Sequence, residues 1–67
     1  MEKRLVPPLE MIVKFINDKK DVDVVLKKSE LRCRIIGVDE YMNLVVDHGL
    51  NRMLIKGSAI YMIKEIV

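Results

Sequence analysis

Apolar and polar residues alternate along this chain with two different periods. From residue 8 to residue 18 the period is that of an amphipathic helix, with apolar side chains at i, i+3, i+4 and i+7. These positions are Leu9, Ile12, Val13 and Ile16. Pro8 suits the start of a helix, because the first helical residues need no N–H partner. We therefore predict a helix over about residues 8–18, mostly covered by the rest of the fold, with one solvated edge.

Beyond residue 20 the period falls to two, which is typical of β-strands. Five short apolar runs follow one another, at residues 22–26, 31–38, 44–46, 53–55 and 59–63. Asp47, His48 and Gly49 form the predicted tight turn after the third run, and Gly37 marks a predicted bend within the second. One helix followed by five strands over about residues 21–66 predicts a mainly β fold. We expect a strongly bent, partly open antiparallel barrel of the SH3-like type.

The last two predicted strands are apolar almost throughout. They lack the prolines and inward charges that normally protect the edge of a sheet. If both strands are edges, the fourth strand of one subunit can pair with the fifth of the next, and repeated head-to-tail contacts of this kind close a ring. If both strands are internal to the barrel, no such pairing is needed. The sequence leaves both arrangements open.

Length and composition limit the ways in which this fold can be stabilised. The 67 residues suffice for one domain, which we place at 1–67, and a core of this size is marginal. The chain has a single cysteine, Cys33, so it cannot form an internal disulfide. With only one cysteine and one histidine in the sequence, we do not expect a zinc site or another metal cofactor. Oligomerisation is the remaining means of stabilisation. The net charge of +2 is too small for a protein that coats duplex nucleic acid, but it allows a few contacts per subunit.

The N-terminal residues have no apolar segment of the kind found in secretory signals. No apolar run approaches the roughly 20 residues of a membrane span. A single thiol suits a reducing compartment. We therefore expect an intracellular protein without a membrane partner.

Two short segments carry the candidate binding chemistry. Asp39, Tyr41 and Asn43 occupy alternate positions after the second strand, and Lys56 precedes Gly57 after the fourth. If the two turns lie side by side, a nucleobase fits between the tyrosine ring and the lysine stem, and the amide can read the edge of the base. The alternative interpretation is that all of these are ordinary turn residues, which are often solvated or bonded to nearby backbone.

No catalytic arrangement of side chains is evident, so we expect neither an enzyme nor a small-molecule substrate. The chain has no Ser/His/Asp set, no paired carboxylates with a base and no glycine-rich phosphate loop. Cys33 is interpreted as a small core residue rather than a nucleophile. Arg32 and Arg34 alternate on one strand, and they either touch phosphate or remain solvated or at an interface.

The sequence contains two motifs that resemble, in their residues and in their order along the chain, those of the Sm and Sm-like proteins, which form rings around single-stranded, uridine-rich RNA. The first motif covers residues 22–47, with an apolar strand, Gly37, Asp39, Asn43 and a second apolar strand. The second motif is the segment 53–57, followed by Ile60. The resemblance extends over nearly the whole chain and implies a helix on a five-stranded barrel, the Sm fold.

The resemblance also implies roles for five residues. A base is held between Tyr41 and Lys56, and Asn43 hydrogen-bonds the Watson–Crick edge of a uracil. Asp39 holds the asparagine or its loop in position, and Gly57 allows a close approach of the backbone. These five residues form the predicted RNA-binding site.

At the level of assembly, the resemblance implies a seven-membered hetero-ring with other Sm proteins, joined through edge strands, on small nuclear RNA. Such rings act in snRNP assembly and pre-mRNA splicing, in the nucleus after assembly in the cytoplasm. Alternatives are a ring of the RNA-decay type, a self-assembling homo-ring and, outside the family, an SH3-like peptide-binding module. Two features depart from the family pattern: Cys33 replaces a glycine of the second strand, and the loop 47–52 is short.

Overall fold

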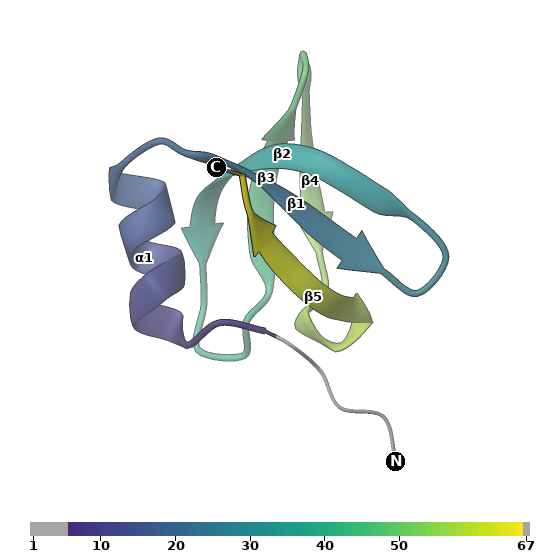
Figure 1. Cartoon of the computed structure of the whole chain (residues 1–67), viewed down its shortest axis with the longest axis horizontal. Coiled ribbons are helices and arrows are strands. Elements are labelled where there is room, and N and C mark those ends of the chain that lie inside the picture. The colour runs from purple at the N-terminus through teal and green to yellow at the C-terminus, as the bar shows by residue number, and fades with distance from the viewer. Residues whose placement is uncertain (1–5, 67) are drawn as a thin grey trace.

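The computed structural model describes residues 6–66, and its elements follow the predicted order. Helix α1 spans Leu9–Asn17. The strands are β1 (Asp21–Leu26), β2 (Glu30–Val38), β3 (Leu44–His48), β4 (Asn51–Ile55) and β5 (Ile60–Glu65), with a short 3-10 helix, η1 (Gly57–Ala59), between the last two. Figure 1 shows α1 beside a strongly curved sheet. The predicted fold, a short helix followed by a bent and incompletely closed five-stranded antiparallel sheet, is confirmed.

The order of strands in the sheet is β4-β3-β2-β1-β5, so the last two strands of the chain are its two edges. Each neighbouring pair is antiparallel. The arrangement in which both strands are internal to a barrel is therefore wrong. The backbone groups on the outer side of β4 and β5 have no strand partner within residues 6–66, which leaves both edges open to another chain.

Two β-bulges bend the sheet. Between Ile35 and Gly37 the pairing of β2 with β3 shifts by one residue, and a second shift interrupts the pairing of β1 with β5 near Leu26. A bulge inserts one extra residue and increases the local twist, so the long strand β2 curves sharply. The predicted bend at Gly37 coincides with the first bulge. The curvature brings distant loops to the same end of the molecule.

The core lies inside the curve of the sheet and beneath α1. Side chains at alternate strand positions point inward, in keeping with the strand period. The buried apolar residues are Ile12, Phe15, Val22, Val24, Cys33, Ile35, Leu44, Val46, Ile55, Ile60 and Ile63. Each large aliphatic side chain of this kind contributes about 1.5–3 kcal/mol when it is fully buried. No buried polar or charged side chain occurs in the part of the chain that the structure describes.

Cys33 belongs to this core, as predicted. Its side chain is 3% exposed and lies opposite Val22 of β1. Burial is the main cause that raises the pKa of the Cys33 thiol to about 11, with a smaller contribution from nearby aspartates. The thiol is therefore protonated at neutral pH and packs as a small apolar group. A side chain at this position is accommodated inside the curved sheet.

The helix is less covered than predicted. Ile12 and Phe15 are buried, whereas Leu9, Met11 and Val13 are between 41% and 43% exposed. Successive helical residues are rotated by about 100°, so a helix that packs on one side of a small sheet can bury only one stripe. The three exposed residues flank that stripe.

The hairpin between β3 and β4 is also tighter than predicted. Asp47 and His48 belong to β3, and the turn consists of Gly49 and Leu50. Gly49 has a φ of 61°, as required at the first central position of a type II′ turn, where glycine is favoured. The cross-strand pairing of Asp47 with Arg52 continues the ladder where a loop was expected.

Candidate nucleic-acid interface

Two loops form the candidate site at one end of the sheet. The first joins β2 to β3 (residues 39–43), and the second begins at Lys56 after β4 and continues into η1. Figure 1 shows both loops at the bottom of the view, opposite the tip of the β3–β4 hairpin. A hydrogen bond of 2.8 Å joins them, from the backbone N–H of Gly57 to Oδ1 of Asn43. The two turns therefore lie side by side.

Asp39 organises the first loop. Its Oδ1 accepts hydrogen bonds from the backbone N–H groups of Tyr41 (2.9 Å) and Asn43 (3.0 Å), and its Oδ2 accepts one from the amide Nδ2 of Asn43 (2.9 Å). Together, chiefly through the Asn43 side chain, these bonds hold the pKa of the Asp39 carboxyl below its usual value of 3.8. The carboxylate is therefore ionised at neutral pH and fixes the shape of the loop.

The orientation of the Asn43 amide follows from its partners. The carboxylate of Asp39 can only accept, so the nitrogen of the amide must face it, and the backbone N–H of Gly57 can only donate, so the oxygen must face that loop. One of the two N–H groups and one of the two oxygen lone pairs are used in this way. One donor and one acceptor remain for a ligand. The amide is held in place between the two loops.

Gly57 is the point of closest approach between the loops. A Cβ atom at this position would lie 2.3 Å from the carbonyl oxygen of Tyr41 and 2.9 Å from the carbonyl group of Met42. Backbone atoms of both loops would have to move apart to admit it. Met42 itself has a φ of 65°, in the left-handed region that non-glycine residues rarely adopt. The close approach thus depends on glycine at 57 and on an unusual backbone conformation at 42.

The side chains of Tyr41 and Lys56 branch from the backbone next to the contact between the two loops at Gly57. The carbonyl group of Tyr41 adjoins Gly57, and Lys56 is the residue before that glycine. Tyr41 is 75% exposed and Lys56 is exposed, so both side chains are accessible to a ligand. The structure therefore brings all five predicted site residues to one end of the molecule. The bond between Asn43 and Gly57 could not be expected from the sequence, because it joins residues 14 apart.

Arg32 and Arg34 are occupied by ion pairs on the outer face of the sheet. Arg32 donates from Nε to Oδ1 of Asp23 at 3.0 Å, and Arg34 lies 3.4 Å from Oδ1 of Asp21. Both carboxylates belong to the neighbouring strand β1. The solvated interpretation of these arginines agrees with the structure better than the interpretation as free phosphate ligands.

Residues 6–66 contain neither a candidate metal site nor a helix long enough to cross a membrane. In the described range 6–66, no three His, Cys, Asp or Glu side chains are grouped so that they could hold a metal ion. The only α-helix within that range, α1, is too short to cross a membrane.

Two of three comparisons with known proteins gave a match that covers most of the chain. No family model matches the chain. A protein of Drosophila melanogaster named "Probable small nuclear ribonucleoprotein E" is 28% identical, over 98% of this chain and 86% of that protein. The structure matches that of a Pyrococcus abyssii Sm protein, solved in complex with a uridine heptamer, with a TM-score of 0.67 and 29% identity, over 90% of this chain and 99% of that one. Both likenesses thus cover nearly the whole chain.

Proposed function

We propose that this chain, which shares the sequence pattern and the fold of the Sm and Sm-like family, is an RNA-binding subunit of an Sm-type ring. The ring would encircle a uridine-rich single-stranded segment of RNA. The observation that carries the proposal is the pair of interlocked loops that hold Asn43 between Asp39 and Gly57. The similar archaeal structure contains a uridine heptamer, which supports the same class of ligand.

The finer assignment is a subunit equivalent to small nuclear ribonucleoprotein E. The Drosophila relative carries that name, and the run from Ile35 to Val45 resembles the E protein of this family. On this assignment the ring is a heteroheptamer with other Sm proteins on spliceosomal small nuclear RNA. The protein would act in snRNP assembly and pre-mRNA splicing, in the nucleus after cytoplasmic assembly. It would have no catalytic activity.

Stacking supplies most of the affinity for a base in this proposal. The ring of Tyr41 and the aliphatic stem of Lys56, both exposed, would form the two walls of the slot. Base–aromatic stacking contributes roughly 1–3 kcal/mol per base and is similar for all bases. The ammonium group of the lysine adds attraction to the RNA backbone. One slot binds weakly, and several slots around one pore bind tightly because their contributions add on the same strand.

Asn43 supplies the selectivity. The remaining N–H of its amide can donate to a carbonyl oxygen of uracil, and the remaining lone pair can accept the uracil N3–H. Cytosine presents its donor and acceptor in the reverse order, and the amide cannot turn over to match it. Turning over would place an amide oxygen against the Asp39 carboxylate and an N–H group against the Gly57 N–H. The fixed amide therefore favours uridine.

The two open sheet edges supply the ring contacts. Strand β4 runs toward the loop end of the sheet and β5 runs away from it. If β4 of one subunit lies beside β5 of the next with all slots directed to one axis, the two strands are antiparallel and their free backbone groups can pair. Such head-to-tail contacts close into a ring. Native mass spectrometry of the chain alone distinguishes a homo-ring from a subunit that needs other Sm proteins.

Two variants of the assembled protein test the site. Tyr41→Ala removes the stacking surface and should weaken binding of oligouridine and oligocytidine alike, by roughly tenfold or more per slot. Asn43→Ala should weaken oligouridine binding and abolish the preference for uridine. Fluorescence anisotropy with both oligonucleotides measures the two effects, and native mass spectrometry shows whether each ring is intact. An unchanged uridine preference in an intact Asn43→Ala ring would refute the proposal.

A further inference from the structure

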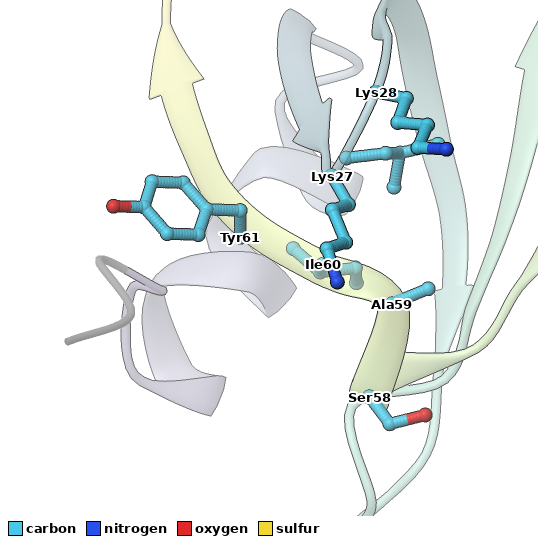
Figure 2. A pocket seen from close by; sticks show the side chains of 7 residues that line it. Lys27, Lys28, Ser58, Ala59, Ile60 and Tyr61 are labelled. Carbon is cyan, nitrogen blue, oxygen red and sulfur yellow. The ribbon is translucent and has the colours of Figure 1, made fainter. Parts of the chain in front are cut away.

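A concave surface adjoins the candidate base slot. It is a hollow of about 660 Å³ between η1, the start of β5 and the loop that follows β1. Figure 2 shows Lys27 and Lys28 on one side of the hollow and Ser58 on the other, with Ile60 between them. No carboxylate lines this hollow. Its floor is apolar and its rim is basic.

The two lysines of the rim differ from most other cations of the sheet. Five ion pairs neutralise Lys20, Arg32, Arg34, Arg52 and Lys64. Within the described residues neither Lys27 nor Lys28 takes part in an ion pair, and both are exposed. Lys56, the cation of the base slot, is likewise unpaired in that part of the chain. Lysines without an ion-pair partner among the described residues therefore lie on two sides of η1, Lys56 on one and Lys27 with Lys28 on the other.

We infer that this hollow binds the phosphodiester backbone of the RNA strand next to the base slot. The inference rests on the proposed function and adds a second binding surface to it. The ammonium groups of Lys27 and Lys28 would neutralise a phosphate, and the Ser58 hydroxyl would donate a hydrogen bond to a phosphate oxygen or a ribose hydroxyl. The ribose would rest on the apolar floor at Ala59, which lines the hollow and is exposed. Interactions of this kind carry no base preference.

The hollow adjoins the base slot on the side formed by Ser58. Lys56 and Ser58 are two residues apart, so their Cα atoms are separated by at most about 7 Å. An RNA strand whose base occupies the slot would therefore pass the Ser58 side of the hollow. A protein strand is a poorer fit, because two lysines without an ion pair among the described residues line the hollow and no carboxylate does.

The test compares two double variants of the assembled protein. Lys27→Ala with Lys28→Ala removes the rim charges. Lys14→Ala with Lys19→Ala removes the same net charge from the helix and from the turn after it, where neither lysine forms an ion pair within residues 6–66. Oligouridine and oligocytidine binding is measured by fluorescence anisotropy over a range of salt concentrations. The logarithm of the binding constant falls with the logarithm of salt by roughly 0.7 for each phosphate neutralised on a single strand.

The rim variant should flatten this salt dependence by roughly 0.7 for each phosphate that the subunit no longer neutralises, while the preference for uridine persists. The helix variant should leave the slope unchanged. Equal slopes in the rim variant and the parent protein would overturn the inference and leave the base slot untouched. A changed oligomer mass in the rim variant would also overturn it, by assigning the hollow to a subunit interface. Failure of the parent protein to bind oligouridine would overturn the proposed function and the inference together.

Discussion

At the scale of single residues, Gly57 is the position where the two loops of the site meet. Alanine at this position would place its Cβ 2.3 Å from the carbonyl oxygen of Tyr41, so the loops would separate. We expect Gly57→Ala to destabilise the fold by about 1–3 kcal/mol, as overpacking does elsewhere. The displaced backbone N–H would also release the Asn43 amide, so the preference for uridine should fall. Thermal denaturation and oligonucleotide binding measure the two effects.

Gly37 offers a matched control for this substitution. A Cβ at Gly37 would meet only the side chain of Val45, at 3.7 Å, which is an ordinary van der Waals distance. Its φ is not in the left-handed region, and alanine is more favourable than glycine within a strand. We expect Gly37→Ala to be neutral or slightly stabilising. Equal stability of the two variants would show that the close approach at Gly57 is unimportant.

Asp39 makes the conformation of the loop dependent on pH. Hydrogen bonds to its carboxylate, first of all from the Asn43 side chain, lower the pKa of Asp39 in the folded protein relative to its usual value of 3.8. The contribution of these bonds to stability is therefore fully present above that usual value and is lost as the pH falls through the lower, folded value. Carbon-13 NMR titration of the Asp39 carboxyl should show the depressed pKa. In Asn43→Ala the pKa should move back toward 3.8, and an unmoved value would contradict this cause.

The residue types of the site could be predicted from the sequence, because their spacing matches two motifs. The precise role of each group could not. Asp39 was expected to hold Asn43 or its loop in position, but the second bond that fixes the amide, from the Gly57 N–H, was not expected. That arrangement depends on the left-handed backbone of Met42 and on a contact between loops, neither of which leaves a local pattern. The role proposed for Lys27 and Lys28 also had no signal in the sequence, because a pair of lysines in a turn usually indicates only a solvated loop.

At the scale of elements, hydrophobic periodicity predicted the helix and all five strands to within a few residues. In β1 and β2 one face lies on the core, which produces the alternation directly, whereas the later strands were recognised as short apolar runs between turn residues. Turn positions were less predictable. Asp47 and His48 resemble turn residues, but they continue the β3–β4 ladder by pairing with Arg52 and Asn51. An ion pair also joins the side chains of Asp47 and Arg52. Gly49 then completes the hairpin with a two-residue turn.

The order of strands in the sheet could not be predicted in this way. The segments 53–55 and 59–63, which predicted β4 and β5, are apolar almost throughout. Apolar strands are as typical of a sheet interior as of an edge that pairs with another chain. The bulges in β2 and β5 curve the sheet, and the pairing leaves it open with β4 and β5 at its edges. A bulge adds one residue to one strand and leaves little trace in the composition. The two edges thus became evident only from the pairing itself.

At the scale of the whole molecule, the distribution of charge separates surfaces with different tasks. Arginines and aspartates pair across the outer face of the sheet, which neutralises that surface. The edge strand β4 instead exposes apolar side chains, with Leu54 at 73% and Met53 at 40% exposure. Apolar residues on an unpaired edge favour association with another chain. Three of the lysines without an ion pair among residues 6–66, Lys27, Lys28 and Lys56, lie around η1, where an RNA strand would pass.

The apolar free edge of β4 predicts how a single added charge on that strand should affect assembly. Leu54→Lys places an ammonium group on the free edge, where pairing with a neighbouring strand would bury it, so we expect the ring to be lost. Leu50→Lys is the matched control: it adds the same charge at the hairpin tip, where the side chain is fully exposed and takes no part in an edge. Native mass spectrometry, with partner Sm proteins where the chain requires them, should show the ring only for the Leu50 variant. If the Leu54 variant retained the parent mass, β4 would not be the strand through which subunits join.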